Sequence, residues 1–254
     1  MKVGLIQYNP IWEDKKANQR KLEGFLKNRA KDTSLLIFPE MSLTGFTMSS
    51  QKYAEDLNGE TTHFFQTLAR KHGCHVIAGL IESATPLPFN SLIHVLPNGT
   101  VSTKYRKMHT IPVYDENIHY QNGAAPAFTS IGDFTYGLSI CFDLRFPELY
   151  RSYLDQNVTA FINIANWPAV RSYHWESLLR ARAIENQCYV IGVNRVGEGN
   201  GITYRGGSVV FDPLGEQLCH CSDKEGLFNT ELEIDLVTET RRSFPVLDSR
   251  TIKK

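Results

Sequence analysis

The chain has 254 residues, and its 27 basic and 27 acidic side chains leave it with no net charge. That balance excludes the strongly basic surface expected of a protein that binds nucleic acids or anionic membranes. A hydrophobic fraction of 42% and a charged fraction of 21% are typical of a globular protein, which excludes a disordered or fibrous chain. The length favours a single domain over residues 1–254, with no nucleic-acid and no membrane partner.

The cysteines and the N-terminal segment indicate a reducing compartment. Five cysteines are an odd number spread over a long chain, which is not typical of a secreted disulfide framework. Cys219 and Cys221 are spaced too closely for the usual zinc ligands, so we predict alternating strand positions there and no metal site. Residues 2–8 are typical of a first strand, and no run approaches 18 apolar residues. We therefore expect a cytoplasmic protein.

Strand-like and helical patterns alternate in the first part of the chain. They predict, in chain order, a strand at 2–8, a helix at 14–30, a strand at 34–38, a helix at 61–72 and a strand at 75–80. The turn signal Pro97-Asn98-Gly99 then predicts a hairpin that joins 91–96 to 101–105. Helix crossovers followed by a hairpin indicate a mixed sheet.

The second part of the chain repeats this mixture. It predicts a strand at 135–140, a helix from Pro147, a strand at 161–164, a helix at 172–187 with Ser172 as its N-cap, and strands at 189–194, 207–211 and 227–233. This order favours a layered α/β sandwich with mixed sheets. The tail 241–254 is basic and mostly non-periodic, and we expect it to be either frayed or docked on a partner subunit.

Glu40 is the first candidate for chemistry. It ends the apolar run Leu35-Leu36-Ile37-Phe38-Pro39, which places its carboxylate at the carboxyl end of a buried strand. Active-site groups of open α/β sheets collect at such edges, and a buried carboxylate suits a general base. The alternative is a surface glutamate just past a strand.

Lys107 and Cys141 are the second and third candidates. Lys107 ends a basic run after the second hairpin strand, and such a run usually lies on a solvated edge. Cys141 follows a strand and precedes a helix start, an arrangement that exposes a nucleophile and aims the next N–H, that of Phe142, at a developing oxyanion. A small buried hydrophobic residue is the alternative for Cys141. A cysteine–histidine pair with one of His109, His119 and His174 is a further alternative.

Taken together, these segments resemble the Glu-Lys-Cys signature of the nitrilase superfamily of carbon–nitrogen hydrolases. The signature segments are Phe38-Pro39-Glu40, Tyr105-Arg106-Lys107 and Cys141-Phe142-Asp143-Leu144-Arg145-Phe146-Pro147-Glu148. Further similar segments are Asn166-Trp167-Pro168 with Arg171 and His174-Trp175, 181–187, 194–197, and 207–208 with 212–215. The stretch 115–123 is most similar to the bacterial omega-amidase branch, whose members hydrolyse 2-oxoglutaramate and 2-oxosuccinamate.

The resemblance implies a four-layer α-β-β-α sandwich with two mixed sheets. It also implies that Glu40 acts as the base, Cys141 as the nucleophile, and Lys107 with the N–H of Phe142 as the oxyanion site. Glu116 takes the place of the family's second active-site glutamate. The reaction needs no cofactor and no metal, and the family commonly forms homodimers. N-carbamoyl amino acid hydrolysis and nitrile hydrolysis on the same fold are the alternative activities.

Because the chain has no net charge, binding the carboxylate of an omega-amide substrate needs a positively charged side chain near the site. Arg145 is the candidate, because arginine binds carboxylates through two parallel hydrogen bonds. A structural ion pair between Arg145 and Glu148 is the alternative. Trp167 either forms a wall of the substrate pocket or packs in the core.

Overall fold

Two six-stranded sheets stack face to face in the computed structural model, which describes residues 1–27 and 32–251. Within this part of the chain the first sheet has the spatial order β14–β1–β2–β3–β4–β5. Its strands are β1 Lys2–Gln7, β2 Leu35–Ile37, β3 His75–Glu82, β4 Phe89–Val95, β5 Val101–Arg106 and β14 Gly226–Glu231. Strands β1, β2 and β3 run parallel, while β14, β4 and β5 each pair antiparallel to a neighbour, so the sheet is mixed.

The second sheet has the order β13–β12–β9–β8–β7–β6. Its strands are β6 Phe128–Ile131, β7 Phe134–Ile140, β8 Ala160–Ala165, β9 Tyr189–Asn194, β12 Val209–Phe211 and β13 Gln217–His220. Strands β7, β8 and β9 run parallel, and the outer strands pair antiparallel. A separate hairpin of β10 Val196–Gly199 and β11 Ile202–Arg205 follows β9.

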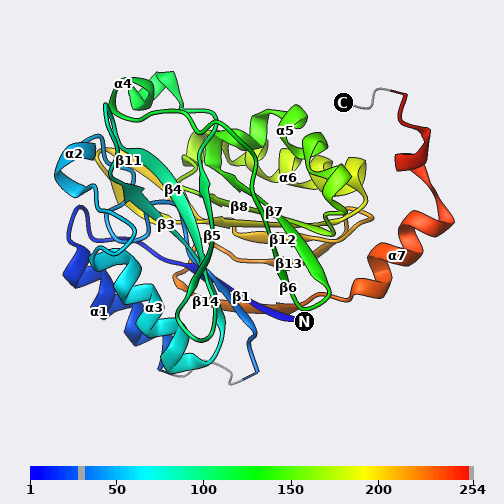
Figure 1. The fold of residues 1–254 in the computed structure, drawn as a ribbon, viewed down its shortest axis with the longest axis horizontal. Helices are drawn as coiled ribbons and strands as arrows, with labels where there is room; N and C mark the ends of the chain where they lie inside the picture. The colour runs from blue at the N-terminus through cyan, green and yellow to red at the C-terminus, as the bar shows by residue number, and fades with distance from the viewer. Residues whose placement is uncertain (28–31, 252–254) are drawn as a thin grey trace.

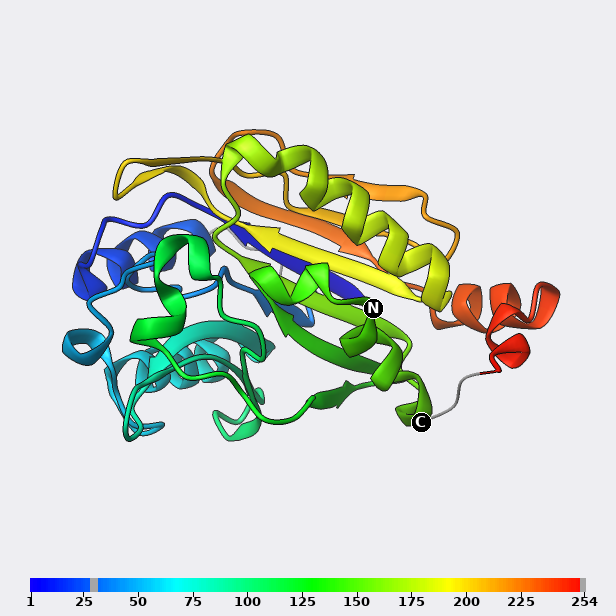
Figure 2. The ribbon, with the colours of Figure 1, turned by 90° about the horizontal axis from the view of Figure 1, so that it is seen from above.

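Helices cover the outer faces of both sheets (Figures 1 and 2). The first sheet is covered by α1 and α3, and the second by α5 and α6. The α-helices are α1 Lys15–Leu26, α2 Ser50–Tyr53, α3 Glu60–His72, α4 Glu116–His119, α5 Pro147–Ser152, α6 Ser172–Asn186 and α7 Ile234–Ser243. The predicted four-layer α-β-β-α sandwich with two mixed sheets is therefore confirmed.

The alternation of side chains along β2 explains why a continuous apolar run is needed there. Leu35 and Ile37 point into the core between the sheets, whereas Leu36 and Phe38 pack in the core beneath α1 and α3. Successive side chains of a strand point to opposite faces, so a strand covered on both faces is apolar throughout. This is the pattern from which the buried strand was predicted.

Most predicted elements are present, with shifted ends. The strand predicted at 207–211 begins only at Val209, because Gly206 and Gly207 have φ of +71° and +72° and cannot continue a strand. Ser172 is the first residue of α6 rather than its N-cap, and its hydroxyl donates to the carbonyl of Ala169. The helix predicted at 14–30 is seen as α1, and residues 28–31 lie outside the described part.

The sequence patterns missed several short elements and the helix α7. The prediction of a non-periodic tail from Arg241 is wrong at its start, since α7 extends to Ser243. Arg241 donates to the carbonyls of Val158 and Gln187 in its own chain, at 2.7 and 3.1 Å, so this residue is docked rather than frayed. The helix projects past the end of the sandwich (Figure 2).

The topology brings the candidate residues to one edge. Strands β2 and β5 run in the same direction in the first sheet, so Glu40 and Lys107, which follow them, lie at the same edge. In the second sheet β7 and β8 run parallel, and Cys141 and Asn166 follow them. The two edges meet, because the backbone N–H of Asn166 donates to the Glu40 carboxylate at 2.7 Å.

Candidate active site

Glu40 is completely buried, so the alternative of a surface glutamate is wrong. The chain turns sharply after it, with Met41 at a φ of +46°, and this turn packs directly on β3. A Cβ on Gly79 would lie 2.8 Å from the Cα of Glu40 and 2.5 Å from the backbone nitrogen of Met41. Only glycine at position 79 leaves room for this turn.

Lys107 is also completely buried, which overturns the expectation of a solvated edge. The basic run divides between the two faces of its strand, as alternation requires. Lys104 and Arg106 pair with Glu82 on one face, and Lys107 turns to the other. There its Nζ lies 3.1 Å from Oε1 of Glu40.

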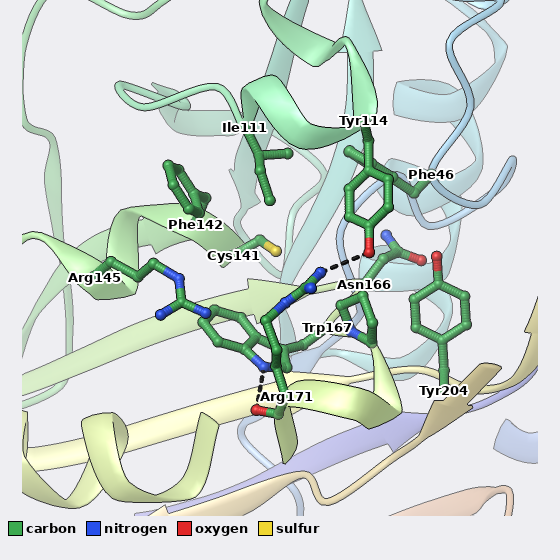
Figure 3. Close-up of a pocket in the computed structure, with 11 residues that line it drawn as sticks. Phe46, Ile111, Tyr114, Cys141, Phe142, Arg145, Asn166, Trp167, Arg171 and Tyr204 are labelled. Atoms are coloured by element: carbon green, nitrogen blue, oxygen red, sulfur yellow. Dashed lines mark hydrogen bonds between the residues drawn. The ribbon is translucent and has the colours of Figure 1, made fainter. Parts of the chain in front are cut away.

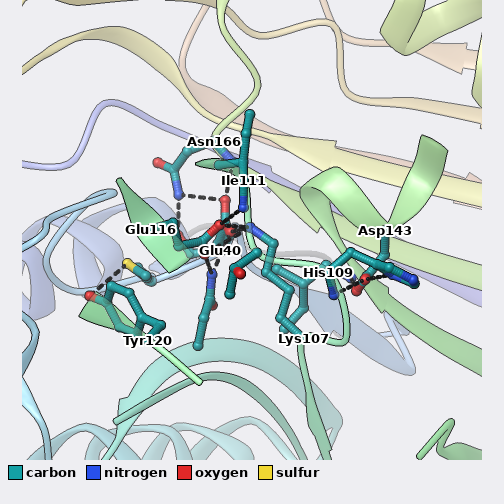
Figure 4. Close-up of polar contacts among 12 residues, drawn as sticks. Glu40, Lys107, His109, Ile111, Glu116, Tyr120, Asp143 and Asn166 are labelled. Carbon is teal, nitrogen blue, oxygen red and sulfur yellow. Dashed lines mark hydrogen bonds and ion pairs between the residues drawn. The ribbon is translucent and has the colours of Figure 1, made fainter. Parts of the chain in front are cut away.

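Glu116 is the second carboxylate of this cluster (Figure 4). Both of its oxygens accept from Nζ of Lys107, at 2.9 and 2.8 Å, and Oε2 also accepts from the N–H of Ile111 at 2.7 Å. Burial raises the pKa of Glu116, although Lys107 opposes the shift. Burial alone would lower the pKa of Lys107, but Glu116 and Glu40 outweigh it and raise that pKa. The lysine therefore stays charged, and a proton on one carboxyl group would relieve the surplus negative charge.

Two asparagines that the sequence did not single out as site residues hold the carboxylates in place. The Nδ2 of Asn90 donates to Oε1 of Glu40 at 2.7 Å and to Oε1 of Glu116 at 2.9 Å. Asn166 donates its backbone N–H to Oε2 of Glu40 and its Nδ2 to the Glu40 carbonyl, both at 2.7 Å. The available signal for Asn90 was an amide side chain within the predicted sheet, because a buried amide needs hydrogen-bond partners.

Cys141 begins the short 3-10 helix η2 (Cys141–Arg145) directly after β7. Its φ of +47° is unusual for a residue with a side chain and marks a sharp strand-to-helix turn. Phe142 is the second residue of η2, so its N–H has no carbonyl partner within the helix. Burial raises the pKa of the Cys141 thiol well above its ordinary value, Glu40 raises it further, and Lys107 opposes the shift. At rest the sulfur is a thiol close to a carboxylate and an ammonium group.

Cys141 lines a small pocket (Figure 3). The predicted substrate residues Arg145 and Trp167 both line it, and so do residues that the sequence did not assign to the site: Phe46, Ile111, Tyr114, Asn166, Pro168, Arg171 and Tyr204. The guanidinium group of Arg145 lies 4.8 Å from the ring centroid of Trp167. Trp167 lines the pocket and is also packed in the core between the sheets, so both interpretations of this residue hold.

Two arginines face this pocket without an acidic partner. Arg171 donates to the hydroxyl of Tyr114 at 2.6 Å, and Arg145 contacts Nδ1 of His174 at 3.3 Å. Within residues 1–27 and 32–251 no carboxylate pairs with either arginine, so the predicted ion pair of Arg145 with Glu148 is absent. Burial lowers the pKa of Arg145, and the like charge of Arg171 adds to the shift. The pocket carries uncompensated positive charge.

The alternative of a cysteine–histidine pair has no support in the geometry. His109 pairs with Asp143 at 2.7 Å, His119 lies at the end of α4, and His174 contacts Arg145. None of the three lines the pocket. In the part of the chain that the structure describes, no three His, Cys, Asp or Glu side chains gather closely enough to hold a metal ion. No described helix is long and apolar enough to cross a membrane.

Comparisons with known proteins show the family of the chain. The model of the carbon–nitrogen hydrolase family matches residues 2–242. The chain is 35% identical to the omega-amidase YafV of Escherichia coli K12 over 248 residues, covering 96% of this chain and 94% of that protein. It is 29% identical to the 2-oxoglutaramate amidase of Bacillus subtilis, covering 97% and 96%.

A solved structure is similar along the whole chain. It is a CN-hydrolase superfamily protein of Xanthomonas campestris with an arsenic adduct in its active site. The TM-score is 0.94 at 30% identity, covering 100% of this chain and 98% of that one. Family, fold and relatives point the same way, and the chain belongs to the carbon–nitrogen hydrolases of the nitrilase superfamily as an amidohydrolase.

Proposed function

We propose that the enzyme hydrolyses the terminal amide of small omega-amides such as 2-oxoglutaramate or 2-oxosuccinamate, releasing the acid and ammonia through a thioester on Cys141. The observation that carries this proposal is the pocket, where the cysteine lies opposite two arginines without acidic partners. A substrate that has an amide at one end and a carboxylate at the other fits both features. The names of the omega-amidase and 2-oxoglutaramate amidase relatives support the same substrates.

The carboxylate end of the substrate would meet Arg145 and Arg171. Guanidinium groups bind carboxylates with two parallel hydrogen bonds, and such bonds are strongest where water is excluded. The aromatic wall of Trp167 restricts the pocket beside Arg145. At the other end, Oδ1 of Asn166 is buried without a hydrogen-bond partner among the described residues. That oxygen can accept from the amide nitrogen of the substrate.

In the first half of the reaction, Glu40 takes the proton of the Cys141 thiol as the sulfur attacks the amide carbon. Negative charge develops on the carbonyl oxygen, and Lys107 with the N–H of Phe142 stabilises it. One donor of this kind contributes about 3–4 kcal/mol to transition-state stabilisation. Glu40 then returns the proton to the amide nitrogen, the C–N bond breaks, ammonia leaves and a thioester remains.

In the second half, Glu40 takes a proton from water, and the resulting hydroxide attacks the thioester carbon. The C–S bond breaks, the sulfur recovers a proton from Glu40, and the acid leaves. Glu116 would keep the lysine ammonium aimed at the oxyanion, because both of its oxygens hold Nζ of Lys107. No bound cofactor takes part in these steps.

Ammonia release across a substrate panel tests the proposal. The panel contains 2-oxoglutaramate, 2-oxosuccinamate, glutamine, asparagine, an N-carbamoyl amino acid and a nitrile. We expect the highest kcat/KM for one of the two oxo-acid amides, and intact-mass analysis should show an acyl group on Cys141. A higher kcat/KM for a neutral nitrile, or an acyl group on another cysteine, would overturn the proposal.

N-carbamoyl amino acids are the second candidate substrates, since they also carry a carboxylate that Arg145 and Arg171 could bind. Hydrolysis of the carbamoyl group releases carbon dioxide along with ammonia, whereas hydrolysis of an omega-amide releases ammonia alone. Measuring both gases therefore separates the two activities in one assay.

We also propose a cytoplasmic homodimer. Two apolar residues are exposed where α6 begins and support a covered face: Val170, just before the helix, is 84% accessible, and Tyr173, in its first turn, is 82% accessible. None of the five cysteines, all of which lie in the described part of the chain, forms a disulfide, which supports a reducing compartment. Light scattering after size exclusion should give a mass near 58 kDa, twice the 28.8 kDa of one chain, and a mass of one chain would contradict the dimer.

A further inference from the structure

Asp143 has an unusual concentration of hydrogen bonds for a residue without a proposed chemical role (Figure 4). Its side chain is completely buried and accepts four hydrogen bonds. Oδ1 accepts from the backbone N–H of His109 at 2.9 Å and contacts the ring Nδ1 of His109 at 2.7 Å. Oδ2 accepts from the Tyr105 hydroxyl at 2.7 Å and from the N–H of Ile140 at 3.0 Å. The partners lie on two different sheets.

These bonds join the nucleophile turn to the segment that carries the lysine. Ile140 and Asp143 flank Cys141 on the second sheet, within two residues of the sulfur. Tyr105 and His109 lie two residues before and two residues after Lys107, which follows the last strand of the first sheet. The side chain of Asp143 therefore ties both flanks of the lysine to both flanks of the cysteine.

The base has its own tie between the sheets. Asn166 of the second sheet donates three hydrogen bonds to Glu40 of the first, from its backbone N–H and its Nδ2. No such bond of Asn166 reaches Lys107. Asp143 therefore supplies a contact between the sheets beside the lysine, separate from the one that Asn166 makes with the base.

The bonding pattern requires a carboxylate rather than an amide. Each oxygen of Asp143 faces one backbone N–H, from His109 or from Ile140, and a backbone N–H cannot accept a hydrogen bond. Asparagine would place its NH₂ group against one of these two donors in either orientation. A buried donor left without an acceptor is destabilising, so the turn would shift to relieve the contact.

The ring of His109 adds a second fixed surface. It stacks on Phe146 with 3.7 Å between ring centroids and 9° between the planes. Phe146 directly follows η2, the helix that Cys141 begins, as its C-cap. His109 therefore contacts this segment at two points: it hydrogen-bonds Asp143 within η2 and stacks on Phe146 after the end of η2.

We propose that Asp143 is a positioning residue that sets the distance between the Cys141 sulfur and the Lys107 ammonium. It does so through its hydrogen bonds with Tyr105 and His109. The inference rests on the proposed roles of Cys141 and Lys107. Misplacement of a reacting group by about 1 Å can lower a rate about 100-fold. Loss of the tie should therefore lower kcat without a matching change in KM, because the substrate carboxylate is bound elsewhere in the pocket.

Three variants remove the tie in steps: D143N, Y105F and H109F, of which the last keeps an aromatic ring on Phe146. The matched control is Y150F, which removes a buried hydroxyl outside the tie. That hydroxyl bonds to Ser139 of the second sheet at 2.8 Å. We expect kcat for 2-oxoglutaramate to fall about 100-fold in D143N and about tenfold in Y105F and H109F, with KM changed less than about threefold. Y150F should keep kcat within about twofold.

Melting temperatures and a double variant separate positioning from simple support of the fold. All rates are measured well below the melting temperature of each variant. In the D143N background, Y105F should cost little further activity, because the two changes remove one connection. Losses of kcat that follow the melting temperatures of all four variants, Y150F included, would overturn the inference.

The closing control is C141A. If C141A is inactive while D143N and Y105F keep the kcat of the parent enzyme, the tie is wrong and the proposed chemistry stands. If C141A keeps its activity, the proposed function itself is wrong.

Discussion

The interior of the site and the mouth of its pocket are built in opposite ways. In the interior, Lys107 is matched by Glu40 and Glu116, and two asparagines and several backbone groups fix these side chains. At the mouth, Arg145 and Arg171 face the pocket with one partner each, His174 and Tyr114, and neither partner is a carboxylate. The charged groups of the interior have partners of opposite charge without a substrate, whereas the arginines of the mouth do not.

The difference separates the reaction from substrate choice. Groups that stabilise a transition state work best when the protein holds them in place before the substrate arrives. Groups that choose a substrate gain most when the substrate supplies the missing charge, since an unpaired arginine in a pocket discriminates against neutral ligands. We therefore expect changes in the interior to lower kcat, and changes at the mouth to raise KM.

Removal of the nucleophile should have the largest effect. C141A leaves no thiol in the pocket, and loss of a nucleophile lowers kcat by more than about 10⁴-fold in comparable enzymes. The residue is small and buried, so the fold should survive, as circular dichroism would show. Cys188 provides the control: it is completely buried and lies at the opposite end of the second sheet, so C188A should keep kcat within about twofold.

Removal of the proposed general base, Glu40, should have the next largest effect. E40Q keeps the size of the side chain but cannot take the thiol proton, and general bases contribute about 10²–10⁴-fold to a rate. We expect kcat to fall by this amount while KM stays near that of the parent enzyme. Thermal unfolding provides the folding control, and normal turnover in a folded E40Q would move the base to another residue.

The mouth should respond with a smaller and more selective change. R171K and R145K keep a positive charge but lose the planar pair of donors, which contributes about 1–3 kcal/mol when a carboxylate is bound. KM for 2-oxoglutaramate should rise roughly 10- to 100-fold, with kcat nearly unchanged. For butyramide, a neutral amide, KM should stay the same. Equal effects on both amides would remove the arginine concerned from carboxylate binding.

Much of the interior was predictable from the chain itself. Glu40 and Cys141 each follow a strand whose apolar run is visible in the sequence, and the edge of a sheet is where such residues meet. Local pattern failed for Lys107, because a basic run also describes a solvated edge. Side chains alternate along β5, and Glu82 pairs with Lys104 and Arg106 on one face, so Lys107 points to the opposite, inner face.

The mouth was less predictable because it is built from short elements. Tyr114 and Arg171 lie in single-turn 3-10 helices, and Tyr204 lies in a four-residue strand of a separate hairpin. Elements of this length do not show a full period of hydrophobic alternation. Their positions depend on how loops from distant parts of the chain meet, which no local pattern contains.

The smallest expected effect concerns Glu82, which pairs with Lys104 and Arg106 on the outer face of β5. Its buried charge contributes to stability and not to the reaction, which sharpens the comparison with the interior of the site. Burial alone would raise the pKa of Glu82, but Arg106 and Lys104 outweigh it and lower that pKa to about 2. Because the folded pKa is depressed, the stabilisation is complete above the ordinary value of 4.5 and is lost as the pH falls toward 2.

E82Q should lower the free energy of unfolding by about 2 kcal/mol at pH 7, and by much less near pH 2.5, with kcat/KM unchanged. Urea unfolding at both pH values measures this, with E60Q in the exposed pair with Lys16 as the control that changes stability by less than about 0.5 kcal/mol. An equal loss at both pH values would show that Glu82 acts through packing and not through its charge.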